Sequence, residues 1–352
     1  MLSKVKRLTP TMRLVYLDAI RAVLSVLVLL YHWGLTKLVS RLLPALTGGA
    51  WGLAVDYFFL LSGFVLCLSL SRRRMGVFRF VAIRAFRLLP VAAAALALWL
   101  VVNAFSSPPA FASWGEVFAN LFLLQPFVSE RSLPATMWSA SYEMWLPSLF
   151  CCFGFLRVLG VRFLVVVLIA FLFFQGQVDS SPMVEETAGW GGLARAVSGL
   201  GSGFFMGSVF LRVRDQLLPD AAFKYLWCGG FFFASALGSL LLAPDFRLLG
   251  FLFPFSAALS IFFLTAAECG AGCAFPSVVR GLVEFFGTRS YSIYLIHLPL
   301  IDLSSHVFGD SLSGNAPLKL ALIGLTLVVS DAVYRFIEAP GYRLRKNFRV
   351  LA

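Results

Sequence analysis

Long apolar segments alternate with short polar segments along almost the whole chain. Runs of about 20 apolar residues, the length that crosses a bilayer as a helix, recur about ten times. They lie near residues 14–36, 51–70, 79–104, 138–157, 161–176, 193–212, 222–243, 246–267, 283–304 and 317–338. This pattern predicts an all-α fold, a polytopic integral membrane helix bundle with about ten transmembrane helices.

Two of the polar connections are long enough to hold structure of their own. The first, near 105–137, contains an amphipathic stretch from Trp114 to Phe127, which we expect to lie along the outer membrane interface. The second, near 177–192, is acidic. Neither an internal repeat nor an appended soluble domain is recognisable, so residues 1–352 are expected to form a single transmembrane domain.

Composition and charge agree with a membrane protein. The chain is 60% hydrophobic and only 13% charged, which leaves too little polar surface to coat a soluble globule. A formal net charge of +12 would suit a nucleic-acid partner, but the Lys and Arg residues cluster in alternate connections and at both ends of the chain. The positive-inside rule then places both termini in the cytoplasm and predicts a multi-pass protein of the inner (cytoplasmic) membrane without a nucleic-acid partner.

The cysteines and the N-terminus add little to this fold. Six cysteines fall mostly inside apolar runs and form no CxxC pair, so neither a disulfide framework nor a metal site is predicted. The first apolar run is long and contains charged residues, which is not the pattern of a cleavable signal peptide.

The first apolar run nevertheless carries the chemistry that organises the chain. It contains Asp18, Arg21 and His32, and ionisable groups within a membrane span are costly enough to indicate a functional site. Arg21 and His32 are eleven residues apart. In a helix this is about three turns, so both side chains share one face, separated by about 16 Å along the axis. Asp18 lies on the same face.

The buried polar residues divide into two layers by their depth in the predicted spans. The outer layer holds a possible acid/base set, His32, Asp56 and Glu143. The inner layer is mainly basic and holds Asp18, Arg21, Arg84, Arg87, Arg289, Arg335 and Glu338. Arg84 and Arg87 share a helix face, as binding of a pyrophosphate would require. The two layers indicate a long anionic donor that enters from the cytoplasm, and coenzyme A has suitable phosphates and a thin pantetheine arm.

Six sequence elements together resemble the acyltransferase-3 family over nearly the whole chain. The family's first-span signature is an Arg or Lys, ten residues and a His, which Arg21 and His32 match. The other elements follow in the family's order: VDYFFLLSGFVL, AIRAFRLLP, MWSASYEMW, FFGTRSYSIYLIHLPL and RFIEAPGYR. The chain departs from the family at Ala19 and Ala22, where Gly is common, and at Met144 and Trp145, where the family often has a second acidic residue.

The resemblance implies an O-acyltransferase that uses acyl-CoA, commonly acetyl-CoA, as co-substrate and O-acetylates a carbohydrate. It implies that His32 is the catalytic base with Arg21 as its motif partner, and that Arg84 and Arg87 bind the donor. The depth of Asp18 and Arg289 places them with the donor as well. Asp56 or Glu143 would orient the His32 ring. Ser62, Ser139, Ser141 and Tyr142 are candidates for substrate binding and, like Arg21, for holding the oxyanion.

Several alternatives remain open at this point. Asp56 and Glu143 could pair with Arg195 or with helix starts, and Arg289 and Glu338 could form an ion pair between helices. Transfer could be direct or could pass through an acyl-enzyme. The acceptor could be an exopolysaccharide, an O-antigen or a lipid-linked sugar.

Other candidates have a structural interpretation or another function. Arg84 and Arg87 could snorkel to phospholipid headgroups, and His297 and His306 are interpreted as packing or interfacial residues. Charges in two layers would also suit a transporter or flippase for an anionic or lipid-linked sugar, although such proteins often show a repeat of two halves, which this sequence lacks.

Overall fold

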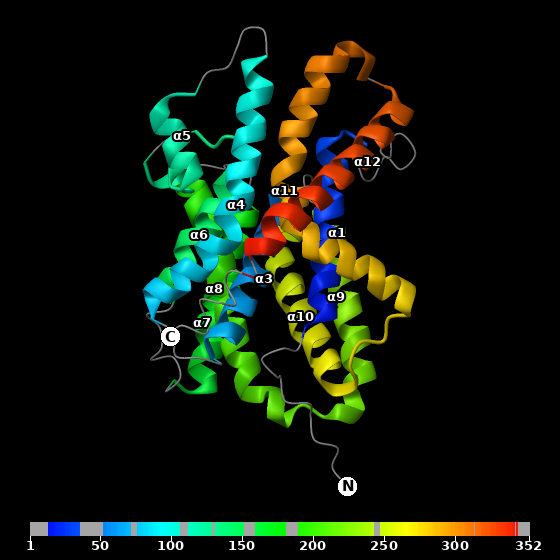
Figure 1. Cartoon of the computed structure of the whole chain (residues 1–352). Helices are drawn as coiled ribbons and strands as arrows, with labels where there is room; N and C mark the ends of the chain where they lie inside the picture. Colours follow the sequence, from blue (N-terminus) through cyan, green and yellow to red (C-terminus); the bar gives the residue numbers. More distant parts are fainter. Residues whose placement is uncertain are drawn as a thin grey trace. The chain divides into compact units, whose positions relative to one another are not determined.

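The computed structural model describes residues 13–35, 52–71, 76–105, 112–128, 131–150, 159–180, 189–242, 247–312, 314–341 and 343. All regular structure within these residues is helical (Figure 1). The α-helices are α1 (Val15–His32), α3 (Gly52–Ser71), α4 (Val77–Ala104), α5 (Trp114–Leu121), α6 (Met137–Phe150), α7 (Val161–Asp179), α8 (Gly189–Val213), α9 (Ala222–Leu242), α10 (Arg247–Ala271), α11 (Ser277–Phe308) and α12 (Ala316–Val333). A π-helical segment, Tyr334–Glu338, continues α12. The all-α prediction is confirmed.

Each apolar run of the sequence contains a helix within its described residues. Among the described residues, seven helices are long and apolar enough to cross a membrane: Val15–His32, Gly52–Ser71, Val77–Ala104, Val161–Asp179, Trp190–Gln216, Leu248–Ala271 and Ala316–Gly341. A polytopic membrane protein is therefore confirmed. That α6, α9 and α11 also span the membrane, and that both termini are cytoplasmic, stay predictions.

The chain folds into two compact units. The first unit comprises residues 1–24, 43–75 and 149–288, and the second unit comprises residues 25–42, 76–148 and 289–352. Two helices, α1 and α11, pass from one unit to the other, α1 between Leu24 and Ser25 and α11 between Thr288 and Arg289.

In the first unit, α3 and α8 approach closely because glycines face the opposing backbone. A Cβ added at Gly63 of α3 would overlap the carbonyl oxygen of Leu200, and one added at Gly203 of α8 would overlap the carbonyl oxygen of Leu60. Small residues at such crossings let membrane helices gain van der Waals contact where the hydrophobic effect between them is weak. This contact gives Gly63, in the VDYFFLLSGFVL element of the sequence, a packing role.

We expect Gly203→Ala to lower the thermal stability of the protein, because its methyl group would collide with the Leu60 carbonyl oxygen. Overpacking of this kind costs about 1–3 kcal/mol. Gly238→Ala in α9 is the control, since no described atom lies within 4 Å of a Cβ added there. Thermal unfolding of both variants in detergent tests the contact, and equal melting temperatures would refute it.

The second unit has an apolar interior built mainly by three helices. It includes Leu88, Val91 and Ala95 of α4, Met137, Ala140 and Met144 of α6, and Leu295, Ile296 and Leu300 of α11. These side chains hold the faces of α4, α6 and α11 in fixed register. The polar residues on the same three helices are positioned by this packing.

Polar contacts order the segment around α5. Ser113 and Glu116 form a capping box at its start, and Glu116 pairs with Arg131 at 2.5 Å. The Arg131 guanidinium and the Ser113 N–H hold the pKa of Glu116 at about 2. The buried Asn120 side chain accepts from the Leu133 N–H at 2.8 Å and donates to the Arg131 carbonyl at 2.7 Å. Trp114 and Phe118 remain exposed, which suits the predicted membrane interface.

Candidate active site

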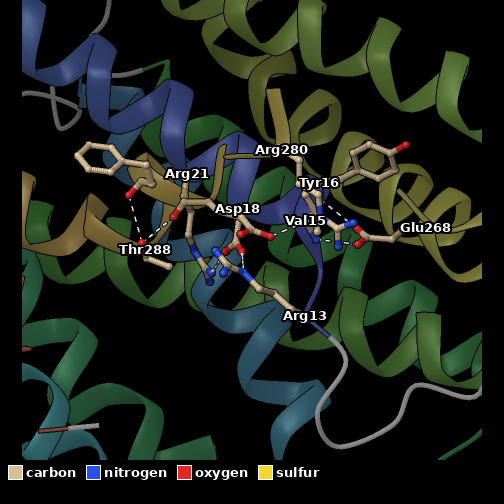
Figure 2. Close-up of polar contacts among 10 residues, drawn as sticks. Arg13, Val15, Tyr16, Asp18, Arg21, Glu268, Arg280 and Thr288 are labelled. Atoms are coloured by element: carbon tan, nitrogen blue, oxygen red, sulfur yellow. Dashed lines mark hydrogen bonds and ion pairs between the residues drawn. The ribbon is translucent and has the colours of Figure 1, made fainter. Parts of the chain in front are cut away.

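The start of α1 is fixed by a buried carboxylate from α10. Glu268 accepts hydrogen bonds from the backbone N–H groups of Val15 at 2.7 Å and Tyr16 at 3.0 Å (Figure 2). These groups have no partner within the helix, and a carboxylate there also complements the positive end of the helix dipole. Arg280 interacts electrostatically with Glu268. The helix that carries Arg21 and His32 therefore begins at a defined residue.

Asp18 joins two arginines on the first turns of α1. Its carboxylate pairs with Arg13 at 2.5 Å and with Arg21 at 3.5 Å (Figure 2). Gly287 of α11 lies against this turn, where an added Cβ would be 2.7 Å from the Asp18 carbonyl oxygen. Asp18 and Arg21 thus share a face, as their spacing predicts. Their contact with a donor stays a prediction.

The ring of His32 is oriented by its own helix. Its Nδ1 lies 2.9 Å from the backbone carbonyl oxygen of Val28. Because a carbonyl oxygen only accepts, this hydrogen bond requires the proton on Nδ1 and leaves the lone pair on Nε2. The His32 side chain is exposed at the end of α1. The Nε2 lone pair can therefore accept a proton from a bound group.

A second histidine, His297 of α11, lies against His32 in the second unit. The two ring centroids are 4.9 Å apart, and the planes are inclined by 56°. His297 is fully buried, and its Nδ1 lies 3.2 Å from the carbonyl oxygen of Ile293. The sequence predicts a packing or interfacial role for His297. Its place in the YLIHLPL element was the signal that could have singled it out.

Of the predicted substrate-binding residues, Ser139 is connected to these histidines. Its hydroxyl lies 2.8 Å from the hydroxyl of Tyr294, whose ring centroid is 6.0 Å from that of His297. Within the second unit, these contacts connect three helices. His32 of α1 contacts His297 of α11, and Tyr294 of α11 contacts Ser139 of α6.

The other predicted substrate-binding residues have different surroundings. Ser141 is buried and donates to the Met137 carbonyl at 3.0 Å. Tyr142 is buried and makes edge-to-face contacts with the rings of Phe127 and Trp138. Ser62 lies on α3 in the first unit.

A charged cluster forms where α4, α6, α11 and the π-helical segment meet. Arg84 pairs with Glu143 at 3.6 Å and also donates to its backbone carbonyl. Arg87 interacts electrostatically with Glu338, which accepts a 2.6 Å hydrogen bond from Ser292. The two predicted donor-binding arginines therefore lie within one group of charged side chains.

Arg289, also predicted to bind the donor, has a carboxylate partner in the second unit. It pairs with Asp331 at 2.5 Å and lies over the ring of Tyr334, 4.6 Å from its centroid. Asp331 pairs in turn with Arg335 at 2.7 Å. The salt bridge of Arg289 is thus to Asp331, whereas the hydrogen-bonded carboxylate of Glu338 faces Ser292.

Comparison with known protein families identifies the family of the chain that carries these residues. A family model described as an acyltransferase domain, acyltransferase-3, matches residues 14–335. The chain belongs to the acyltransferase-3 family. This acyltransferase is a multi-pass membrane O-acyltransferase, and the family implies that it uses an acyl donor. The resemblance found in the sequence motifs is confirmed.

A curated relative of this acyltransferase is the peptidoglycan O-acetyltransferase OatA of Listeria monocytogenes. The two are 35% identical over 65 residues, which is 18% of this chain and 10% of the relative. The similarity thus covers about a tenth of that relative's length. No solved structure matches the acyltransferase at a significant level.

Asp56 of the acyltransferase is held in a buried ion pair. Arg195 of α8 donates to its carboxylate at 3.0 and 2.9 Å, and both side chains are at most 1% exposed. Arg195 also donates to the Gly52 carbonyl at 2.7 Å. Asp179 of α7, which sequence reasoning did not single out, is buried and interacts electrostatically with both partners. This favours a structural role for Asp56, one of the two roles the sequence allowed.

The second unit thus holds an oriented imidazole and a charged cluster that includes Arg84 and Arg87. The Val28 carbonyl provides the orientation of His32 that Asp56 or Glu143 was expected to provide. Glu143 instead contacts Arg84. A base role for His32 and phosphate binding by Arg84 and Arg87 stay predictions.

Proposed function

We propose that the protein transfers an acetyl group from cytoplasmic acetyl-CoA to a hydroxyl of a carbohydrate at the extracytoplasmic side of the inner membrane. The observation that supports this most is the His32 ring, whose Nδ1–H is bound to Val28 and whose Nε2 is left as a base. The name of the relative, a peptidoglycan O-acetyltransferase, supports an acetyl group and a sugar acceptor. Exopolysaccharide, O-antigen and lipid-linked sugars are the acceptor classes to test.

In this proposal the transfer is direct. Nε2 of His32 removes the hydroxyl proton while the hydroxyl oxygen attacks the thioester carbonyl carbon. The tetrahedral intermediate then breaks its carbon–sulfur bond, and the imidazolium returns the proton to the leaving thiolate. Base catalysis of this kind contributes about 10²–10⁴-fold. The Val28 carbonyl keeps the ring in one orientation throughout and its negative end stabilises the imidazolium.

The donor's phosphates are proposed to bind Arg84 and Arg87. Both lie on α4, one helical turn apart, within the charged cluster of the second unit. The contacts of Arg84 with Glu143 hold its guanidinium in place before the donor arrives. A preordered guanidinium loses less side-chain entropy when it binds phosphate. Roles for Arg21, Asp18 and Arg289 in donor binding remain predictions.

The function is tested by turnover of radiolabelled acetyl-CoA by the purified protein. We expect label to move from the thioester to a sugar acceptor supplied in the same detergent or liposomes. Transport of the sugar without any loss of thioester would contradict the proposal. Mass spectrometry of surface glycans from a strain that lacks the protein would identify the acceptor and the acyl group together.

Replacement of Arg87 by Ala is expected to raise the KM for acetyl-CoA by about 10- to 100-fold, the loss typical of one charge-assisted hydrogen bond. The KM for the acceptor should stay within about twofold, the change that a contact worth less than 0.5 kcal/mol produces. Arg162→Ala is the matched control, because Arg162 is an exposed arginine of another predicted span, α7. Steady-state kinetics with each substrate varied tests this. A change confined to the KM for the acceptor would contradict the proposal that Arg87 binds the donor.

A further inference from the structure

Among the described residues, the partner of the ring nitrogen that orients His32 is a backbone carbonyl and not a carboxylate. Its Nδ1–H is bound to the neutral Val28 carbonyl, and the predicted carboxylates are engaged by arginines, Glu143 by Arg84 and Asp56 by Arg195. Nevertheless the proposed mechanism requires His32 to carry a positive charge while it holds the hydroxyl proton. A second group that stabilises this charge, besides the Val28 carbonyl, is therefore expected near the ring.

His297 is the ring that lies against His32 in the second unit, 4.9 Å between centroids. Its Nδ1 donates to the Ile293 carbonyl, so its lone pair is on Nε2. Within the described part of the chain, Nε2 is buried and has no hydrogen-bond partner. A second proton on this nitrogen would bury an unpaired charge beside His32, so His297 stays neutral.

We propose that His297 is a positioning residue for His32, an inference that rests on the proposed function. Its neutral ring, 4.9 Å from the His32 ring between centroids, supports that ring, and its Nε2 lone pair stabilises the imidazolium formed during transfer. A lone pair is effective here because the site of His297 is shielded from water, where electrostatic interactions are strong. No bond to His297 forms or breaks in the reaction.

Two variants distinguish the contribution of the His297 ring from the contribution of its lone pair. His297→Phe keeps an aromatic ring against His32 but removes the lone pair, whereas His297→Gln places an amide oxygen near the position of Nε2. We expect His297→Phe to lower kcat by about 10- to 100-fold with both KM values unchanged. His297→Gln should recover most of that loss.

The matched control is His306→Phe on the same helix. His306 has the same local hydrogen bond, from Nδ1 to the Asp302 carbonyl at 2.7 Å, but it is exposed. This variant should keep the kcat of the unmodified protein. Thermal unfolding and gel filtration of each variant confirm that the folded protein is compared. If His297→Phe does not remain monodisperse, His297→Leu takes its place with the same expected loss.

The outcomes separate the two proposals. A normal kcat for His297→Phe, or equal losses for the Phe and Gln variants, would overturn the role of His297. An active His32→Ala protein would overturn the proposed function itself. An inactive His32→Ala protein together with a fully active His297→Phe protein would refute only the inference about His297.

Discussion

Replacement of His32 by Ala is expected to lower acetyl transfer by about 10²–10⁴-fold, the contribution of a general base. The KM for acetyl-CoA should change little, because the proposed phosphate ligands are on another helix. His32 is exposed at the end of α1, so its loss should hardly affect folding. The assay is transfer of labelled acetyl to the acceptor at matched amounts of folded protein.

The control for this experiment is His306→Ala, which removes an exposed imidazole from α11. It should leave transfer unchanged. His32→Gln is a useful second variant, because it keeps a polar side chain but no group of suitable basicity. Near-normal transfer by His32→Ala would assign the base to another residue.

Replacement of Arg195 by Met is expected to destabilise the first unit by about 3–5 kcal/mol, because it leaves the Asp56 carboxylate buried without its charge partner. The double variant Asp56→Leu with Arg195→Met should recover much of that loss, since the buried ion pair is then removed as a whole. Chemical or thermal unfolding in detergent measures both effects.

Arg214→Met is the matched control, since Arg214 pairs at 3.6 Å with the exposed Asp215. Exposed pairs contribute about 0–1 kcal/mol, so little destabilisation is expected. The same double variant also tests the role of Asp56 in catalysis. If it folds and transfers acetyl normally, Asp56 is structural; loss of kcat in a fully folded double variant would return Asp56 to the catalytic set.

The helices are the part of the fold that the sequence determines most directly. Every apolar run predicted as a span contains a helix, because a chain in lipid must satisfy its backbone hydrogen bonds internally. The amphipathic stretch from Trp114 is also a helix, α5, and its Ser113 and Glu116 cap follows from local sequence. The length of a helix and its local capping do not depend on the helices against which it packs.

The candidate site was predictable only in part. The residues from Arg21 to His32 form one unbroken helix, as the sequence predicts. Arg84 and Arg87 lie in one charged cluster, also as predicted from their spacing. The hydrogen bond from His32 to Val28 is local and follows from helix geometry. The proximity of His297 is different, because 265 residues separate it from His32 and nothing in the periodicity of either helix pairs them.

The sequence by itself thus determined a helical membrane protein, its family and the residue types of its chemistry. Only the tertiary structure decided which side chains meet: Asp56 with Arg195, Glu143 with Arg84, Arg289 with Asp331, and His32 with His297. The physical reason is that apolar length and helical period set each helix on its own, whereas the partner of a buried charge depends on how the helices pack. That packing rests on contacts between distant residues, such as Gly203 against Leu60.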